Sequence, residues 1–293
     1  MQRKVSLYIP CYNVEQYLAP VIEGVMGLRQ APDEVMIIDD GCRDRTLEIA
    51  ARYPVRIIRH EGNKGLAAAR NTGIRSACND LVASLDADCV PEPDWLEKLV
   101  APFDDPSVAL AGGKLREGVL VSAADRWRQA HMPQDWGNER LLNPRFVFGN
   151  NVIVRKSVVE EVGWYKEEFR TNGEDSDISR RIRAKGYSTV YEPAARVTHL
   201  RQDTVRSVMA TLYRWYWTGT DGMKLRSVLG RSFRLHFGTN IYEFVKTDLQ
   251  KKNFDLLGLD LLTLLYMPYF DIRAFLRGFG ATEPKLVCAE KKE

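Results

Sequence analysis

The chain has 293 residues, of which 45% are hydrophobic and 28% are charged. This composition is that of an ordinary soluble globular protein, and the length allows one large hydrophobic core or two modest ones. The net charge of +3 is a small excess, and no strongly basic face is evident, so we expect no nucleic-acid partner.

Cysteine usage and hydropathy indicate the compartment. The five cysteines are odd in number and none are spaced as CxxC, which argues against a disulfide framework and for a reducing compartment. The most apolar stretch, residues 256–270, is interrupted by Asp260 and Pro268 and is too short to span a bilayer. We therefore expect a cytoplasmic protein, with peripheral contact to the inner membrane face as an open alternative.

Short apolar runs alternate with helix-like segments up to Leu85. Runs of four or five residues rich in Val, Ile and Leu, separated by helices, are typical of βαβ units. They predict an α/β fold whose mostly parallel sheet is covered by helices on both faces. The predicted strands are Val5–Ile9, Val35–Ile38, Val55–Ile58 and Leu81–Leu85, and the predicted helices are about Glu15–Leu28, Asp44–Arg52 and Leu66–Ala77.

The pattern changes after about Gly113. The segment 114–150 has few clean periods, and from Thr204 onward the pattern is largely helical. We therefore expect a domain at 1–203, made of halves 1–113 and 114–203, followed by a helical C-terminal region at 204–293. Within residues 151–200 we expect a strand at Val152–Val154, helices near Ser157–Val162 and Asp177–Lys185, and an extended segment at Ser188–Tyr191.

Polar or acidic residues follow three of the predicted strands. Pro10–Asn13 follows the first strand, Asp39–Gly41 the second and Asp86–Asp88 the fourth. Ligands of an open parallel sheet bind outside the carboxyl ends of its strands. We therefore expect these segments to converge on one edge of the sheet and to form the binding site.

Asp86 and Asp88 are predicted to hold a divalent metal ion. They are two residues apart in an extended segment, so both carboxylates project to the same side. Two such charges are costly unless a cation lies between them or one is protonated, and oxygen ligands suit Mg²⁺ or Mn²⁺. An Asp-x-Asp alone more often marks a polar turn, but its place after an apolar strand, opposite Asp39 and Asp40, favours metal binding.

Two other positions have both a structural and a chemical explanation. Glu174-Asp175 precedes the predicted helix Asp177–Lys185, where Asp175 would be the N-cap. Alternatively, one of these carboxylates is a general base for an acceptor hydroxyl, and the two roles are compatible. His199 is either a third metal ligand or an ordinary hydrogen-bonded histidine.

Lys64, Gly65 and Arg70 flank the start of the predicted helix Leu66–Ala77. Cations beside a helix N-terminus would strengthen an anion site there, although a solvated first turn is the structural alternative. No GxGxxG or GxxxxGK[ST] pattern occurs, which argues against a dinucleotide-binding fold and against a P-loop.

Taken together and in chain order, these segments resemble the family 2 glycosyltransferases, which have the GT-A fold. The similarity covers about residues 4–200, and six modest motifs in the family's order make it specific. The chain departs from the pattern at Cys42, where a small hydroxyl residue is more usual, and at the charged Arg43. The matching segments are Val5–Asn13, Glu34–Asp44, Asn63–Asn71, the metal motif Asp86–Asp88, Phe148–Asn151 with Arg155, and the base motif Gly173–Asp177.

The resemblance implies an inverting, metal-dependent glycosyltransferase that uses Mn²⁺ or Mg²⁺. Its donor would be a nucleotide-diphosphate sugar, with UDP-sugars favoured, and its acceptor a hydroxyl of a glycan, lipid-linked glycan or protein. The enzyme would act in the synthesis of cell-surface polysaccharides or glycoconjugates. Residues 1–113 would bind the donor and 114–203 the acceptor. Residues 204–293 lie outside the resemblance, and our hypothesis is that they recruit the acceptor or a partner, with contact to a membrane surface as an open alternative.

The resemblance also implies roles for single residues. The catalytic carboxylates would be Asp175, as the base, and Glu174. The metal ligands would be Asp86, Asp88 and His199. The acceptor contacts would be Asn150, Asn151 and Trp136. The contacts to the nucleotide sugar would be Pro10, Tyr12, Asn13, Asp39, Asp40, Lys64, Gly65, Arg70, Asp86 and Ala87.

Two other functions stay open at this point. A haloacid dehalogenase-type phosphatase would use Asp86 as its nucleophile, since Leu85–Val90 fits a DxDx[TV] pattern. That motif normally ends the first strand of its domain, whereas three predicted strands precede it here. A non-catalytic nucleotide-sugar-binding module is the second alternative, and the presence of Asp86, Asp88 and Asp175 argues against it.

Overall fold

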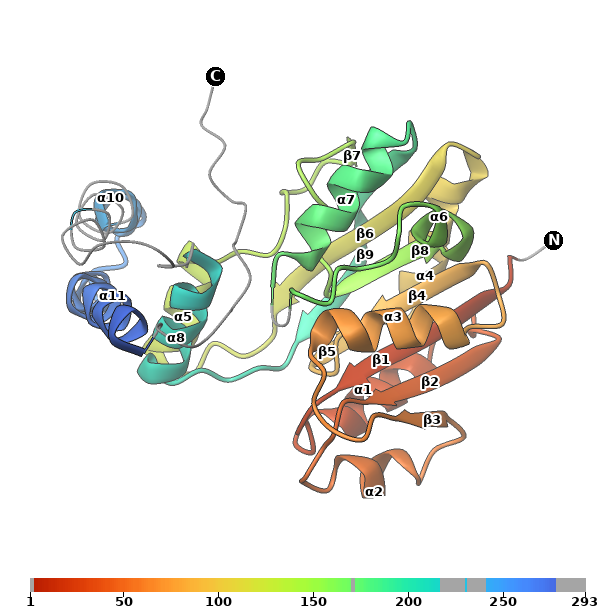
Figure 1. Cartoon of the computed structure of the whole chain (residues 1–293). Coiled ribbons are helices and arrows are strands. Elements are labelled where there is room, and N and C mark those ends of the chain that lie inside the picture. The colour runs from red at the N-terminus through yellow and green to blue at the C-terminus, as the bar shows by residue number, and fades with distance from the viewer. Residues whose placement is uncertain (1–2, 170–171, 217–229, 231–240, 278–293) are drawn as a thin grey trace. The chain divides into compact units, whose positions relative to one another are not determined.

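The computed structural model describes residues 3–169, 172–216, 230 and 241–277 (Figure 1). The chain divides into two compact units. The first comprises Met1–Gly118 and Gln134–Arg201, and the second comprises Val119–Pro133 and Gln202–Glu293. Val119–Pro133 thus packs with the C-terminal helices, although the sequence pattern grouped it with residues 114–203.

The described residues of the first unit form a nine-stranded sheet in the order β3-β2-β1-β4-β8-β6-β9-β5, with β7 paired to β9. Strands β1 to β4 run parallel to one another, whereas β8 runs antiparallel to both β4 and β6. The predicted α/β fold with a mostly parallel sheet is therefore confirmed. The strands are β1 Val5–Cys11, β2 Glu34–Asp39, β3 Arg56–Arg59, β4 Leu81–Leu85, β5 Cys89–Pro91, β6 Val108–Glu117, β7 Leu141–Leu142, β8 Asn151–Arg155 and β9 Ser188–His199.

Helices cover both faces of this sheet (Figure 1). One hydrophobic layer joins the sheet to α1, α2 and α4, and the other joins it to α3, α6 and α7. Two covered faces are what a parallel sheet of apolar strands requires. The helices are α1 Leu18–Met26, α2 Thr46–Ala50, α3 Leu66–Ser76, α4 Trp95–Val100, the 3₁₀ turn η1 Ala101–Asp104, α6 Lys156–Glu161 and α7 Glu174–Ala184.

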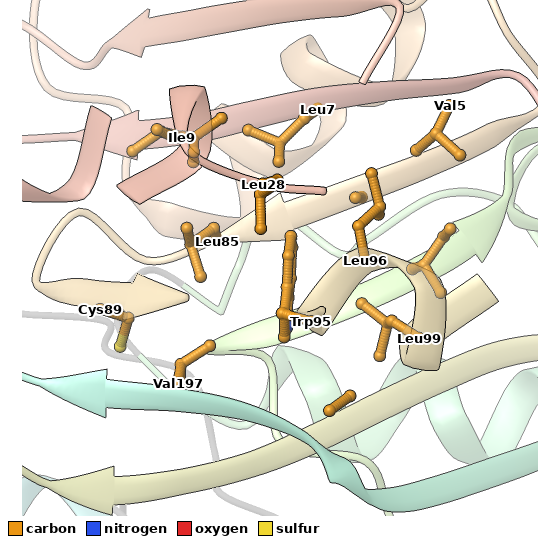
Figure 2. Close-up of a cluster of buried hydrophobic side chains, with 14 of the residues drawn as sticks. Val5, Leu7, Ile9, Leu28, Leu85, Cys89, Trp95, Leu96, Leu99 and Val197 are labelled. Carbon is orange, nitrogen blue, oxygen red and sulfur yellow. The ribbon is translucent and has the colours of Figure 1, made fainter. Parts of the chain in front are cut away.

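Strand β1 shows how alternation fills the two layers. Leu7 and Ile9 belong to the layer with α1 and α4, which Figure 2 shows around Trp95. Tyr8 belongs to the layer with α3, because successive strand side chains point to opposite faces. Helix α3 packs close to this strand: a Cβ at Gly73 would lie 2.4 Å from the Tyr8 ring. This close approach places the side chains of α3 over the central strands.

The second unit is helical in its described residues, as the C-terminal pattern predicted. Its core includes Trp127, Leu212, Phe244 and Met267. Among the helices of the described ranges, none combines the length and the apolar character that crossing a bilayer requires. The helices are α5 Ala123–His131, α8 Val205–Tyr216, α10 Ile241–Lys251 and α11 Leu257–Arg277.

Some predicted element bounds were wrong. The extended segment expected at Ser188–Tyr191 is only the first part of β9, which continues to His199. A register shift of β9 against β6 breaks the alternation that a sequence pattern can detect. The helix expected from Asp177 begins at Glu174, because Gly173 turns the chain with a φ of 89°.

Candidate active site

The carboxyl ends of β1, β2 and β4 bring three of the predicted segments to one edge of the sheet. The registers pair Cys11 with Asp39 and Tyr8 with Ser84. The loop after β1, the acidic turn after β2 and the Asp86–Asp88 segment after β4 therefore begin beside one another.

The loop after β1 is tied to the loop after β2. The Asn13 N–H donates to the Cys42 sulfur at 3.3 Å, and the Arg43 N–H donates to the Asn13 side-chain oxygen at 2.8 Å. Asn13 has a φ of 53°, a conformation that asparagine tolerates better than most residues. Pro10 is buried within β1, whereas Tyr12 is exposed. The Tyr12 ring is therefore open to a ligand at this edge.

Asp39 is a buried carboxylate at the end of β2. It accepts a hydrogen bond from the Cys42 N–H at 2.7 Å and another from Arg59 at 3.2 Å. The first bond shapes the turn after β2, and the second leaves the exposed Arg59 side chain beside the same edge.

Both carboxylate oxygens of Asp40 are used within the protein. Oδ1 pairs with His60 Nδ1 at 2.7 Å and accepts from the Lys64 N–H at 2.8 Å, while Oδ2 accepts from the Gly65 N–H at 2.9 Å. Gly65 has a φ of 98°, which a side chain would strain. Asp40 therefore holds the turn that leads into α3, and the Lys64 side chain is exposed there.

Arg70 is a buried cation that joins three parts of the site. It donates to Ser84 at 2.9 Å and to Asp86 at 3.3 Å, and its Nε lies 3.4 Å from Glu174. Burial disfavours the charged guanidinium, but the negative charge of Asp86 and its neighbours outweighs this and raises the pKa of Arg70. The charge is therefore kept, because a buried cation is tolerated when it is paired.

Asp86 stands directly after β4, and its side chain is 32% exposed. Its backbone N–H donates to the Asn150 carbonyl at 2.9 Å, which fixes the position of the segment. Burial, opposed by Arg70 and reinforced by Asp88, raises the pKa of Asp86 to about 6. The protein alone disfavours the ionised form of this carboxyl, and a bound cation would stabilise that form.

Asp88, His199 and Glu117 form a connected line. His199 Nε2 lies 3.3 Å from Asp88 Oδ2, and its Nδ1 lies 2.9 Å from Glu117 Oε2. Burial would lower the pKa of His199, but its hydrogen bonds to Asp88 and Glu117 raise it to about 9. A histidine held from behind by a carboxylate is the common arrangement for metal-ligating histidines. Asp88 and His199 therefore lie side by side, with Glu117 behind the histidine.

Glu174 and Asp175 lie in the first turn of α7. The N-cap is Gly173, so the N-cap role considered for Asp175 is wrong. Asp175 accepts from the Ser176 N–H at 2.7 Å and from the Gly149 N–H at 3.4 Å. The helix begins earlier than the apolar pattern indicated, and its first turn carries acidic residues, which the helix dipole favours.

The two carboxyls hold protons more tightly than exposed ones do. Burial, reinforced by the charge of Asp175, raises the pKa of Glu174 to about 7, and burial also raises the pKa of Asp175. Gly149 brings Asp175 and Arg70 near the same backbone: a Cβ there would lie 2.8 Å from Arg70 Nη2 and 3.6 Å from Asp175 Cβ. A buried carboxylate whose pKa is raised is a stronger base and can accept a proton from a hydroxyl.

The asparagines expected to contact an acceptor are both buried. Asn151 accepts from the Trp95 indole at 3.4 Å and donates to the Asn150 side chain at 2.9 Å. Asn150 in turn donates to Gln134. Asn151 has no exposed surface, so its contribution is to hold Asn150 and the end of β8 in place.

Trp136 belongs to the first unit and is half-buried in the segment that precedes β7. Its indole N–H donates to the Phe146 carbonyl at 2.8 Å. Its ring centroid lies 5.2 Å from that of Phe146 and 5.5 Å from that of Phe148. Packed rings of this kind present a rigid apolar surface.

Sequence patterns did not single out Glu117, Ser84 or Gly149. Glu117 is identified only by the pairing of β6 with β9, in which it lies opposite His199. Ser84 is an inconspicuous residue inside an apolar strand, and only its bond to Arg70 gives it a role. Gly149 lay within a motif, yet its proximity to Arg70 depends on the folded chain.

Comparisons with solved structures show the GT-A fold. A mannosyltransferase from Pyrobaculum calidifontis, solved in complex with GDP-Man and Mn²⁺, superimposes with a TM-score of 0.59 and 18% identity, covering 95% of this chain and 88% of the other. Residues 1–349 of Staphylococcus aureus TarS superimpose with a TM-score of 0.57 and 15% identity, covering 94% of this chain and 92% of the other. At these identities the likeness concerns the fold alone.

Curated relatives share sequence over most of this chain. The pre-mycofactocin glycosyltransferase of Mycobacterium tuberculosis is 33% identical over 219 residues, which are 71% of this chain and 45% of that protein. The poly-beta-1,6-N-acetyl-D-glucosamine synthase of Staphylococcus aureus is 25% identical over 227 residues, 74% of this chain and 55% of that protein. The chain thus spans about half the length of these relatives.

A family pattern gives the most direct assignment. The pattern described as glycosyl transferase family 2 matches residues 6–163, which is more than half of the chain and includes β1 to β4 and the Asp86–Asp88 segment. The chain therefore belongs to glycosyl transferase family 2.

Proposed function

We propose that the protein is an inverting, metal-dependent glycosyltransferase that moves a sugar from a nucleotide-diphosphate sugar to a hydroxyl acceptor. The observation that carries this proposal is the pair of acidic groups on either side of Arg70. Arg70 bonds to Asp86 at 3.3 Å and lies 3.4 Å from Glu174. Asp86 is suited to a metal ion, and the first turn of α7, which carries Glu174 and Asp175, is suited to proton acceptance; the proposed reaction uses both.

The residues present fit a divalent ion. Asp86 and Asp88 are partly exposed carboxylates, at 32% and 25% of their side-chain surface, and Glu117 orients His199 from behind. Two oxygens and an imidazole nitrogen suit Mn²⁺ well and Mg²⁺ less well. When bound, such an ion would offset the charge that develops on the departing diphosphate.

The donor would lie along the carboxyl ends of β1, β2 and β4. Tyr12 offers an exposed ring for a base, Asp39 a carboxylate at the same edge, and the exposed Lys64 a cation near the diphosphate. The mannosyltransferase named above was solved with GDP-Man and Mn²⁺, and TarS was also solved with UDP-GlcNAc. We keep a UDP-sugar as the first donor to test and a GDP-sugar as the second.

Asp175 would be the catalytic base. Its raised pKa has burial as its main cause, and the Ser176 and Gly149 N–H groups orient its two oxygens. In a single displacement it would take the proton of the acceptor hydroxyl as that oxygen attacks the anomeric carbon and the nucleoside diphosphate leaves. Direct attack from the face opposite the leaving group inverts the anomeric centre.

The acceptor is proposed to be a growing glycan or another glycoconjugate. The names of the relatives include a polysaccharide synthase and a glycosyltransferase of mycofactocin precursors, so the family similarity alone spans several acceptors. Trp136, Phe146 and Phe148 pack into a ring surface in the first unit that is suited to stack on a sugar ring. The cytoplasmic location and a peripheral membrane contact stay predictions.

Release of nucleoside diphosphate from a panel of nucleotide sugars tests the proposal. Slow hydrolysis of one donor with Mn²⁺, abolished by a chelator and by Asp86→Ala, is the expected result. If no donor turns over but UDP or GDP with Mn²⁺ still binds in calorimetry, an acceptor-saturated assay with glycan primers follows. Binding without turnover in that assay would support the non-catalytic module, and no binding would contradict the donor site itself.

A further inference from the structure

The helical unit contains a cluster of ionisable side chains that the proposed reaction does not use. His131 is the last residue of α5, Asp248 lies in α10 and Asp260 lies in α11. His131 Nε2 lies 2.9 Å from Asp248 Oδ2 and 3.7 Å from Asp260 Oδ1. One ligand atom from each of the three residues lies within 4.8 Å of the others.

The cluster is enclosed. The His131 side chain is 2% exposed, and the side chains of Asp248 and Asp260 are 0% exposed. The His131 ring packs against the rings of Trp127 and Phe244, with centroids 4.9 and 4.8 Å away. Carboxylates are rarely left in such surroundings without a full set of partners, because removing their charge from water is costly.

Neutral donors hold one oxygen of each carboxylate. The Trp127 indole N–H donates to Asp260 Oδ1 at 2.7 Å, and the Asn253 side chain donates to Asp248 Oδ1 at 3.0 Å. This leaves Asp248 Oδ2 against His131, while Asp260 Oδ2 is buried without a hydrogen-bond partner. The outer donors thus orient both carboxylates and leave one oxygen of each to a further group.

Charge balance indicates what that group is. A protonated His131 could neutralise one of the two carboxylates. Burial raises the pKa of Asp260, so a proton on Asp260 is the alternative to a cation, and the metal measurement below separates the two. A divalent cation with a neutral imidazole and two carboxylates gives a group with no net charge, which a dry interior accepts far more readily. The closed surroundings and the mixed nitrogen and oxygen ligands favour a transition metal such as Zn²⁺ over Ca²⁺ or Mg²⁺.

We propose that His131, Asp248 and Asp260 form a structural Zn²⁺ site that clamps α5, α10 and α11 together. Its role is distinct from that of the Asp86–Asp88 segment, and it does not depend on the proposed glycosyl transfer. The three ligands come from three helices, so binding would resist the separation of the N-terminal segment 119–133 from the C-terminal helices.

Metal content of the full-length chain tests this site. The protein is purified without a metal-affinity step, incubated with Zn²⁺, desalted and measured by inductively coupled plasma mass spectrometry. We expect about one retained zinc per chain. The Asp86→Asn/Asp88→Asn double variant should retain the same amount, whereas Asp260→Asn should retain almost none. Asparagine keeps an oxygen for the Trp127 N–H, which makes it the mildest change that removes the ligand.

Matched controls separate a lost ligand from a lost fold. Asp255→Asn alters an exposed carboxylate of the same unit and should keep the zinc. If Asp260→Asn does not fold, the wild-type chain is instead loaded with Co²⁺, whose visible absorption bands report nitrogen and oxygen ligation. Those bands should be the same in the Asp86→Asn/Asp88→Asn variant and should disappear on competition with Zn²⁺.

Thermal unfolding supplies a second readout. Chelation should lower the midpoint of the wild-type chain by several degrees, with Zn²⁺ restoring it, and Asp260→Asn should not respond. The proposal is overturned if the wild-type chain retains no zinc after loading, or if the zinc is lost in the Asp86→Asn/Asp88→Asn variant and kept in Asp260→Asn.

Discussion

Each unit of the chain places a histidine beside carboxylates, and the two groups differ mainly in their access to water. In the first unit Asp86 and Asp88 keep 32% and 25% of their side-chain surface exposed, and Glu117 holds His199. In the second unit Asp248 and Asp260 are 0% exposed, and Trp127 and Asn253 supply the outer bonds.

The difference teaches what each group can do. A metal held by few protein ligands at an exposed sheet edge keeps room for a substrate oxygen, which catalysis requires. A metal enclosed by aromatic rings has no such room and can serve only stability. The same residue types therefore point to chemistry in one unit and to structure in the other.

The largest predicted effect is at Asp175, the proposed base of the first unit. Asp175→Asn should reduce turnover about 10³-fold, because it removes the proposed proton acceptor, with little change in the affinity for donor and metal. Turnover is measured as nucleoside diphosphate released in the presence of acceptor. Ser176→Ala, one residue away, is the control and should stay near wild type. Equal turnover in Asp175→Asn would remove Asp175 from the proposed mechanism.

A smaller effect is predicted for the residue behind the histidine of the first unit. Glu117→Gln should lower the affinity for Mn²⁺ about 10- to 100-fold, since it removes the carboxylate that orients His199. Activity should recover at high Mn²⁺, which a general loss of structure would not allow. A Mn²⁺ titration of activity measures this, and zinc retention by the helical unit should be unchanged. An unaltered titration would show that His199 needs no such support.

Glu174 should make stability depend on pH. Its pKa is raised from 4.5 to about 7, mainly by burial, so the folded chain binds this proton more tightly than the unfolded chain. Stability is therefore lost as the pH rises from about 4.5 through 7. Glu174→Gln, which cannot ionise, should gain about 1–3 kcal/mol over wild type at pH 8 and little at pH 5. Denaturant unfolding at the two pH values measures this, and an equal difference at both would contradict the raised pKa.

The smallest effect is expected at an exposed ion pair of the helical unit. Arg126 lies 2.7 Å from Asp255, and their side chains are 42% and 58% exposed. Arg126→Ala should cost less than about 1 kcal/mol, since exposed pairs are screened by water and salt. Unfolding with and without added salt measures this cost. A loss of several kcal/mol would mean that charges at the surface of this unit matter as much as those inside it.

Local patterns were sufficient for the first four strands and for most of the motifs. Short continuous runs rich in Val, Ile and Leu, with helices between them, predict β1 to β4, and the parallel order makes their carboxyl ends meet. They were insufficient for α5, whose helix carries a capping box of Ser122 and Asp125 but was hidden in a segment without a clear period. They also predicted too short a strand for β9, because its register shift interrupts the alternation.

The sequence by itself determined the α/β architecture, the family and the acidic residues at the strand ends, because these depend on residues near one another in the chain. Only the tertiary structure placed Glu117 behind His199, 82 positions away, and His131 against Asp248, 117 positions away. Contacts over such separations depend on how strands and helices pack and leave no local period. The proposed catalytic metal ligands could therefore be predicted, whereas the residues that orient them, and the buried cluster of the helical unit, could not.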